Sequence, residues 1–576
     1  MARPNFLIIV ADDLGFSDIG CFGGEIKTPN LDKLGAAGTR FTGFHTASAC
    51  SPTRAMLMSG TDHHLAGVGQ MVEFMTAGSK AQQAYWKDKE GYEGELNRKV
   101  AALPELMKDA GYFTLMSGKW HLGLTKATAP CSRGFDRNFS MLHGGHNHYA
   151  FEPQVQPSDA SDVDEGPGSP LRNPGKPPLY MEGDQFIPAS SLPADFYSTE
   201  TFTDRLVEYL EGRSPTEKQA PFFAYLPYTA PHFPLQAPDR LIAKYKGRYD
   251  AGPEVLRVER IEHLKRLGLI PQNVHPHPMV PHFKTKNWVD LAEDERKKSA
   301  KMMEVYAAMV ESIDENVGKV VEYLKTTGEF ENTFIMFISD NGAEGGLLEA
   351  RPMFGERVQN AIKKYYDNSL ENIGRGNSYV YYGPRWAQAA TAPSRLYKTW
   401  ITEGGIRTPC IVHYPKYKQA NITHAMTTCL DLLPTMLELA GATHPSETGN
   451  GVFRGRKVLP VRGKSWVPLL SGAASEVYPD DYAICWELFG QQAIRKGDYK
   501  AIFIPKPMGS GKWELYNVAA DAGEVTNIAA KEPLRLESMI TEWSAYALNS
   551  NVVEMPPSPL GGGSKKGKGG AAGAKL

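Results

Sequence analysis

Residues 5–13 read Asn-Phe-Leu-Ile-Ile-Val-Ala-Asp-Asp, an unbroken apolar run that ends in two aspartates. Such a short run, rich in β-branched residues, is typical of a strand that is buried on both faces, as strands of parallel sheets are. Phe222–Leu226 and Phe334–Ile338 have the same character, and the second of these is also followed by polar residues. We therefore expect these runs to form buried strands of one sheet.

Helical patterns lie between these runs. Residues 30–37 follow Thr28-Pro29, which is a helix-start signal, and residues 101–110 repeat the pattern. A longer helix is expected over about residues 299–325. Alternating strands and helices predict an α/β fold with a large, mostly parallel central sheet flanked by helices. In such sheets, ligands bind just beyond the carboxyl ends of the strands.

Composition divides the chain into three parts. Residues 1–442 contain the runs above and are expected to form the larger domain, in which residues 152–194 are rich in Pro, Gly, Ser and Asp and predict a long loop. Residues 443–555 predict a smaller C-terminal α+β domain, with a hairpin around residues 496–498. Residues 556–576 contain mostly small residues and lysine and are expected to be a disordered tail.

The chain has 576 residues, with 63 Lys and Arg against 65 Asp and Glu, and a net charge of −2. Hydrophobic residues make up 41% and charged residues 22%, which is ordinary for a soluble globular protein. The balanced charge gives no reason to expect binding to nucleic acid or to an anionic membrane. No apolar stretch approaches the ~20 residues of a membrane span. The six cysteines are scattered, which argues against a disulfide scaffold.

Polar side chains follow two of the predicted strands. Asp12 and Asp13 come after the first, and Asp340 and Asn341 come after Phe334–Ile338. Carboxylate and amide oxygens are hard ligands that suit Ca²⁺ or Mg²⁺, whereas zinc prefers nitrogen and sulfur. Taken alone, Asp-Asp and Asp-Asn-Gly are also common in helix caps and turns. These residues therefore leave both interpretations open, a cation site or turns.

Two further stretches carry a family resemblance. Residues 50–54 read Cys-Ser-Pro-Thr-Arg, a Cys-x-Pro-x-Arg motif that leads into an apolar helical stretch. Residues 111–121 read Gly-Tyr-Phe-Thr-Leu-Met-Ser-Gly-Lys-Trp-His. Together with the order and spacing of the acidic pairs, these stretches resemble the two signatures of the type I sulfatase family, which belongs to the alkaline phosphatase superfamily. The resemblance covers about residues 3–550 and is greatest to bacterial arylsulfatases.

The resemblance implies an alkaline phosphatase-like fold, with residues 1–442 as the catalytic sulfatase domain. It implies that a formylglycine-generating enzyme oxidises Cys50 to Cα-formylglycine, whose hydrate attacks sulfur through one hydroxyl and expels sulfate with the help of the other. One Ca²⁺ ion would bind a sulfate oxygen and polarise the ester. The ligands implied for this ion are Asp12, Asp13, Asp340 and Asn341.

The resemblance also implies the other site residues. Arg54 lies next to the nucleophile in the motif and would stabilise its deprotonated oxygen. Lys119 and Lys398 would bind the charge of the sulfate group. His121 would take the proton of the second hydroxyl, and His232 would bind the substrate and protonate the departing alcohol, because imidazole titrates near neutral pH.

The dipeptide His63-His64 has no implied role. It follows Asp62 shortly after the stretch that contains the predicted nucleophile. A histidine outside any motif is most often a hydrogen-bonded structural residue, so we predict no catalytic part for this pair.

The expected activity is that of a sulfuric ester hydrolase of arylsulfatase or alkylsulfatase type, which cleaves small sulfate monoesters to an alcohol and sulfate. A phosphonate monoester or phosphodiester hydrolase is the alternative within the superfamily, because tetrahedral sulfate and phosphate esters need similar positive charges. A protein that binds sulfate esters without turnover is the alternative outside enzymes, and the intact Cys50 motif argues against it. Related two-zinc hydrolases carry histidine where Asn341 stands, and an amide oxygen disfavours zinc.

Both ends of the chain bear on its location. The first apolar run is too short for a signal peptide and ends in aspartates, so we expect a soluble intracellular protein. The chain ends in Ala574-Lys575-Leu576, which is similar to the Ser-Lys-Leu peroxisomal address. We therefore expect either a cytoplasmic or a peroxisomal location.

Overall fold

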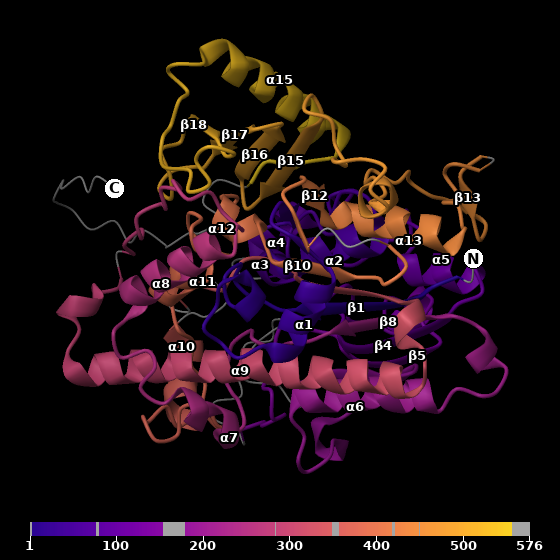
Figure 1. The fold of residues 1–576 in the computed structure, drawn as a ribbon, viewed down its shortest axis with the longest axis horizontal. Coiled ribbons are helices and arrows are strands. Elements are labelled where there is room, and N and C mark those ends of the chain that lie inside the picture. The colour runs from indigo at the N-terminus through magenta and orange to yellow at the C-terminus, as the bar shows by residue number, and fades with distance from the viewer. Residues whose placement is uncertain are drawn as a thin grey trace.

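The computed structural model describes residues 3–76, 80–153, 179–282, 284–347, 356–417, 421–448 and 450–555. The expected tail over 556–576, with its terminal tripeptide, and most of the expected loop over 152–194 lie outside these residues. Figure 1 shows a broad body built around one large sheet, with a smaller sheet and a covering helix from the C-terminal part of the chain packed on its upper side.

In the described part of the chain, ten strands form one sheet with β1 (Asn5–Ala11) near its centre. β1 pairs in parallel with β9 (Thr333–Ser339) on one side and with β8 (Phe222–Pro227) on the other. The strand order is β11-β2-β10-β9-β1-β8-β4-β5-β6-β7, and the pairs from β9 to β5 are all parallel, which confirms the expected fold class. The other strands are β2 (Thr39–Phe41), β4 (Phe113–Lys119), β5 (Arg137–Met141), β6 (Tyr180–Glu182), β7 (Gln185–Ile187), β10 (Cys410–His413) and β11 (Asn421–Thr423).

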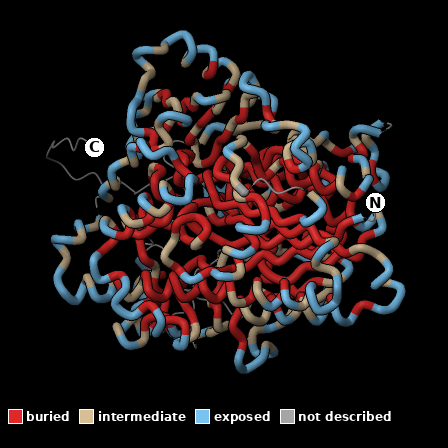
Figure 2. The backbone as a smooth tube through the Cα atoms, viewed as in Figure 1, coloured by how far each residue is buried: buried red, intermediate tan, exposed pale blue. Residues whose placement is uncertain are grey.

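Both faces of β1 are buried, which explains its unbroken apolar run. Leu7 and Ile9 belong to the hydrophobic cluster on one face of the sheet, and Phe6 and Ile8 belong to the cluster on the other. Alternate residues of a strand point to opposite faces, so each of these positions needs an apolar side chain. Figure 2 shows the buried residues filling the body around the sheet, with the exposed residues at its margins.

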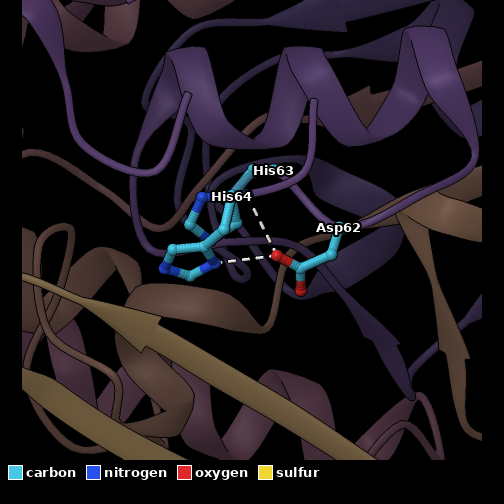
Figure 3. A group of neighbouring side chains, drawn as sticks. All are labelled: Asp62, His63 and His64. Carbon is cyan, nitrogen blue, oxygen red and sulfur yellow. Dashed lines mark hydrogen bonds and ion pairs between the residues drawn. The ribbon is translucent and has the colours of Figure 1, made fainter. Parts of the chain in front are cut away.

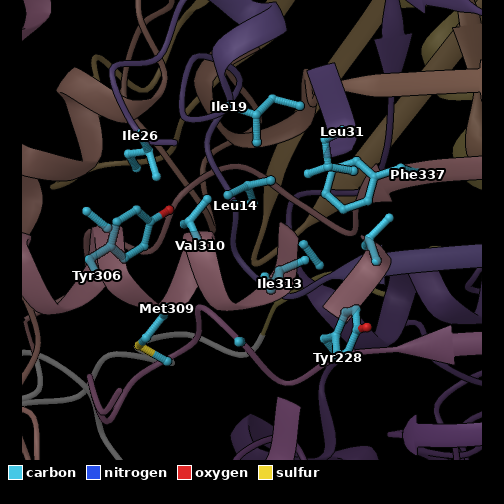
Figure 4. Packing of buried hydrophobic residues seen from close by; sticks show 14 of the residues in the cluster. Leu14, Ile19, Ile26, Leu31, Tyr228, Tyr306, Met309, Val310, Ile313 and Phe337 are labelled. Atoms are coloured by element: carbon cyan, nitrogen blue, oxygen red, sulfur yellow. The ribbon is translucent and has the colours of Figure 1, made fainter. Parts of the chain in front are cut away.

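The longest helix of the described residues is α9 (Glu293–Thr326), which runs along one face of the body beside α6 (Ser198–Glu211). The sequence pattern predicted that this helix starts at about residue 299, but it begins earlier, at Glu293. Its first turn is acidic, and Glu295 accepts a hydrogen bond from the backbone N–H of Ala292 at 2.8 Å, which extends the helix. In Figure 4, Tyr306, Val310 and Ile313 of α9 pack among apolar side chains from the N-terminal segment.

Further helices cover both faces of the sheet and the C-terminal part of the chain (Figure 1). They are α1 (Pro29–Ala37), α2 (Cys50–Ser59), α3 (Val72–Thr76), α4 (Lys80–Trp86), α5 (Leu103–Asp109), α7 (Asp239–Ile242), α8 (Pro253–Arg266), α10 (Glu356–Tyr365), α11 (Pro384–Ala390), α12 (Glu403–Ile406), α13 (Leu432–Ala440), α14 (Val467–Leu470) and α15 (Pro533–Asn549).

Part of the segment that was expected to be a loop forms a hairpin. β6 and β7 pair antiparallel around residues 183–184, and β6 extends the sheet beyond β5. Tyr180 and Met181 are buried at this edge. The expectation of a continuous loop is therefore wrong for residues 180–187, because strands this short show too little alternation to stand out in the sequence.

The C-terminal part contains a four-stranded antiparallel sheet covered by α15. β16 and β17 form the predicted hairpin. One face of this sheet packs against Met539 and Trp543 of α15, and the other contacts Ile401 and Ile406 of the larger body. The apolar contacts of this second face therefore join the two parts. The strands are β15 (Ala483–Leu488), β16 (Gln491–Lys496), β17 (Tyr499–Phe503) and β18 (Trp513–Asn517), and two short pairs join β3 (Phe44–His45) to β12 (Thr427–Thr428) and β13 (Val452–Phe453) to β14 (Arg456–Lys457).

The cohesion of this fold comes from packing and hydrogen bonding. All six cysteines are free, so no disulfide links the two parts. Among the described residues, no helix is long and apolar enough to cross a membrane.

Candidate active site

The carboxyl ends of β1 and β9 lie side by side, and the polar residues that follow them form one group, which we call the strand-end cluster. Asp12 and Asp13 follow β1, Asp340 and Asn341 follow β9, and all four are fully buried. Asn341 Nδ2 donates a hydrogen bond to Asp13 Oδ1 at 2.7 Å. Asp13 has a φ of 70°, a left-handed conformation that is uncommon in residues other than glycine and is often found at functional sites.

Three buried cations compensate for the aspartates of this cluster. They come from α2, from the end of β4 and from the loop after α11, so distant segments of the chain supply them. An unpaired charge at such a depth would be strongly destabilising, which makes the pairing necessary. The pairs are Lys119 Nζ with Asp12 Oδ2 at 2.6 Å, Lys398 Nζ with Asp13 Oδ2 at 2.9 Å, and Arg54 Nη2 with Asp340 Oδ2 at 2.7 Å.

The pKa values of two of these aspartates are shifted in opposite directions. Burial acts to raise the pKa of Asp13, but Lys398 holds it well below its usual range. Burial and the neighbouring Asp12 carboxylate raise the pKa of Asp340 to about 6. The carboxylates therefore still repel one another in spite of their partners, and a further cation would relieve this repulsion.

Two oxygen atoms of the strand-end cluster lack a hydrogen-bond donor among the described residues. Asp12 Oδ1 and Asn341 Oδ1 are buried and accept no hydrogen bond from any described residue. Most buried polar atoms in proteins have a partner, and these two oxygens lie in a group of aspartates, where a cation would be a suitable one. Carboxylate and amide oxygens are the ligands that Ca²⁺ and Mg²⁺ prefer. The four predicted ligands therefore fit a hard cation better than they fit zinc.

Cys50 is the first residue of α2 and borders the strand-end cluster. Burial acts to raise the pKa of its thiol, but the charges of Lys119, Lys398 and His121 together bring the pKa below its usual value. The N-terminus of a helix also favours negative charge. The position of Cys50 therefore suits an anionic nucleophile.

His121 lies between Cys50 and a residue that the sequence analysis missed. Its Nδ1 is 3.3 Å from Cys50 Sγ, and its Nε2 is 2.8 Å from Glu73 Oε1. Burial acts to lower the pKa of His121, but Glu73 and Cys50 outweigh it and raise the pKa to about 9. Glu73 belongs to the short helix α3, in a stretch without a motif, so its sequence context does not distinguish it from a surface glutamate.

His232 faces the strand-end cluster from the loop after β8. Its Nε2 lies 3.6 Å from Asp13 Oδ2, and its Nδ1 donates a hydrogen bond to the carbonyl oxygen of Phe233 at 2.5 Å. Burial lowers the pKa of His232 to about 3, so the imidazole is neutral near pH 7 with its proton on Nδ1. With His232, all the residues that the sequence analysis assigned to the site are in one place.

His63 and His64 lie in a different group of side chains, which Figure 3 shows in part and which we call the His64 cluster. His64 Nδ1 is 2.7 Å from Asp62 Oδ1, and His64 Nε2 is 2.8 Å from Glu487 Oε2 of β15. The other oxygen of Asp62 accepts a hydrogen bond from Tyr546 of α15 at 2.7 Å. This cluster joins the loop after α2 to the C-terminal sheet and its helix.

Comparison with protein families agrees with this geometry. The family model described as Sulfatase matches residues 4–442, a range that contains every residue of the site. The chain belongs to the sulfatase family. A second model, described as N-sulphoglucosamine sulphohydrolase, C-terminal, matches residues 395–542, which include the small sheet of this sulfatase.

Several known sulfatases are similar to this chain, and the matches extend over most of both proteins. An uncharacterized sulfatase of Schizosaccharomyces pombe is 51% identical over 555 residues, which cover 96% of this chain and 95% of that protein. An arylsulfatase of Klebsiella aerogenes is 37% identical over 473 residues, which cover 80% of this chain and 91% of that protein. The crystal structure of Ps i-CgsB in complex with k-i-k-neocarrahexaose has a TM-score of 0.64 and 25% identity, and the match covers 97% of this chain and 96% of that one. The chain is therefore a sulfatase enzyme, and its relatives support hydrolysis of sulfate esters.

Proposed function

We propose that this sulfatase hydrolyses sulfate monoesters of small alcohols and phenols, with Cys50 in its formylglycine form as the nucleophilic residue and one Ca²⁺ ion in the strand-end cluster. The observation that carries the proposal is the position of Cys50. It begins α2 at 3.3 Å from a nitrogen of His121, and the charges of Lys119 and Lys398 both act on it. An anionic ester that enters this position meets a nucleophile, a base and two cations.

The motif around Cys50 supports its conversion by a formylglycine-generating enzyme. When formylglycine is present, its hydrated aldehyde supplies two hydroxyls on one carbon, one to attack sulfur and one to restore the carbonyl as sulfate leaves. A thiol has no second hydroxyl and would remain sulfated. The chemistry therefore explains why this motif accompanies the charged site.

The residues around position 50 would bind the sulfate group. Lys119 and Lys398 are each held by an aspartate, so their ammonium groups are already placed for the charge of the transition state. Arg54 is held in the same way by Asp340 and would stabilise negative charge on the attacking oxygen. When bound, Ca²⁺ would supply a Lewis acid for a sulfate oxygen.

Two histidines would move the protons. His121 is within hydrogen-bonding distance of position 50 and would accept the proton of the second hydroxyl. His232 would protonate the departing alcohol through Nε2, which faces the strand-end cluster. His232 is neutral without substrate, and the negative charge of a bound sulfate ester would raise its pKa. Substrate binding would therefore favour the protonated form of His232, which acts as the acid.

Peptide mass spectrometry and paired substrates test the proposal. The peptide that contains residue 50 should have the mass of formylglycine, and turnover should be proportional to the converted fraction. Nitrophenyl sulfate should have a higher kcat/KM than the matching nitrophenyl phosphonate ester. Intact thiol throughout a fully active preparation would contradict the assigned nucleophile. A preference for the phosphonate would favour the phosphonate monoester hydrolase of the same superfamily.

A further inference from the structure

A line of three buried side chains leads from the nucleophile position into the protein. Cys50 Sγ lies 3.3 Å from Nδ1 of His121, whose Nε2 lies 2.8 Å from Glu73 Oε1. The three residues are 1%, 4% and 7% exposed. We propose that Glu73 is a positioning residue, which orients the ring of His121 and stabilises its positive charge when it takes a proton from residue 50. This inference rests on the proposed function, since it concerns how that proton is removed.

The surroundings of Glu73 give its carboxylate no separate structural task. Its side chain is hydrogen-bonded to His121, and its other oxygen, Oε2, accepts no hydrogen bond from the described residues. The contact with His121 is therefore the main interaction that stabilises the charge of this buried carboxylate.

The backbone at residues 144 and 121 leaves room for the contact between Glu73 and the imidazole ring of His121. A Cβ atom at Gly144 would lie 2.5 Å from Glu73 Oε1 and 2.8 Å from His121 Cε1, closer than real Cβ atoms approach. His121 itself has a φ of 57°, which is uncommon for a residue other than glycine. A glycine at 144 and a left-handed residue at 121 therefore both accommodate the contact between Glu73 and His121.

The contact with Glu73 determines which nitrogen of His121 serves residue 50. Burial acts to raise the pKa of Glu73, but His121 lowers it to about 2, so the carboxylate is ionised. An ionised carboxylate only accepts hydrogen bonds, and Nε2 of His121 therefore carries a proton directed at Glu73. When the ring is neutral, Nδ1 is therefore the nitrogen that lacks a proton, and it lies next to residue 50, where it can accept the proton of a hydroxyl. The imidazolium that forms is stabilised by its ion pair with Glu73.

Glu73→Gln tests this inference with a small change of shape. The amide oxygen still accepts a hydrogen bond from Nε2, but the negative charge is lost. We expect kcat per formylglycine to fall about 10²-fold, within the range that positioned acid–base groups contribute, with a change in KM of less than about threefold. Glu73→Asp restores the charge and should recover part of the lost kcat.

A pre-steady-state measurement distinguishes positioning from general damage. His121 would act after the alcohol has left, so Glu73→Gln should release about one equivalent of nitrophenolate in a burst before slow turnover. Damage to the whole site would slow the first release as well and remove the burst. Formylglycine content and Tm are measured for each variant, so that failed maturation or folding is recognised.

Glu487→Gln is the matched control, because Glu487 makes the same kind of buried contact at 2.8 Å from Nε2 of His64. It should lower Tm and leave kcat per formylglycine unchanged. The inference is overturned if Glu73→Gln keeps kcat within about twofold of the unaltered protein, or if it loses kcat without a burst. Failure of the proposed function would look different, because the unaltered protein itself would not hydrolyse sulfate esters.

Discussion

Two buried histidines with acidic partners lie near opposite ends of helix α2. His121 contacts Cys50 at the start of this helix and pairs with Glu73, whereas His64 lies just beyond its end and pairs with Asp62 and Glu487. Burial acts to lower the pKa of both histidines, and in both the acidic partners raise it to about 9. By pKa and burial alone, the two regions look alike.

The two regions differ in the atoms that lack partners. In the His64 cluster, both ring nitrogens of His64 and both carboxylate oxygens of Asp62 have partners. Around His121, by contrast, Glu73 Oε2, Asp12 Oδ1 and Asn341 Oδ1 accept no hydrogen bond from the residues that the structure describes. A structural cluster satisfies its own polar atoms, whereas a binding site keeps some for its ligand. The raised pKa is common to both regions, whereas the unpartnered carboxylate and amide oxygens distinguish the region around His121 from the His64 cluster.

The largest expected difference between the two regions concerns the nucleophile. Cys50→Ala should lower kcat/KM for nitrophenyl sulfate by about 10⁴-fold or more, because no neighbouring group can replace the attacking oxygen. Cys485→Ala, in β15 close to Glu487, is the control and should keep full activity per formylglycine. Steady-state rates and thermal unfolding check both variants. If Cys50→Ala retains more than about a tenth of the activity, the nucleophile is elsewhere.

Removal of the metal should affect the strand-end cluster and leave the His64 cluster unchanged. Chelation should lower activity by about 10³-fold, because a Lewis acid for the sulfate group is lost. It should also lower the free energy of unfolding by about 3 kcal/mol, the stabilisation expected from an ion present at a hundred times its Kd.

Metal analysis tests directly which of the two clusters binds the ion. We expect one Ca²⁺ per chain in the unaltered protein, loss of the ion in Asp340→Asn, and a retained ion in Asp62→Asn. An ion that disappears only in Asp62→Asn would make the His64 cluster the metal site and would refute the ligand set proposed above.

His232 differs from His121 and His64, because its pKa is lowered and not raised. His232→Ala should lower kcat/KM for alkyl sulfates by about 10²-fold to 10³-fold, since their alkoxides need protonation to leave. Nitrophenyl sulfate should lose about tenfold or less, because nitrophenolate leaves without a proton. Rates over a series of leaving groups give this dependence, and equal losses across the series would assign His232 to positioning.

The smallest expected effect is the pH dependence of stability at His64. Its pKa rises from 6.5 to about 9 on folding, so its stabilisation is complete below about pH 6.5 and is lost as the pH rises through about 9. A shift of this size corresponds to at most about 3 kcal/mol. Urea unfolding between these pH values should show a steeper loss of stability for the unaltered protein than for His64→Gln. Parallel pH profiles would show that His64 contributes no such linkage.

Much of the fold and of the active site could be predicted because the signals are local. The apolar run of β1 ends in Asp12-Asp13, and the run of β9 ends in Asp340-Asn341. Because the ends of adjacent parallel strands meet at one edge of a sheet, these residues had to lie close together once the two strands were neighbours. The Cys-x-Pro-x-Arg motif likewise brings Cys50 and Arg54 onto one helix.

The partners of the two histidines could not be predicted in this way. Glu73 lies 48 residues before His121, and Glu487 lies 423 residues after His64, and neither glutamate belongs to a motif. Burial and hydrogen bonding of a carboxylate depend on which distant segments pack around it, and a local pattern does not contain that information. The sequence by itself determined which reactive groups this sulfatase has and which strands present them. Only the tertiary structure decided which glutamate supports each histidine, because the packing of distant segments places Glu73 against His121 and Glu487 against His64.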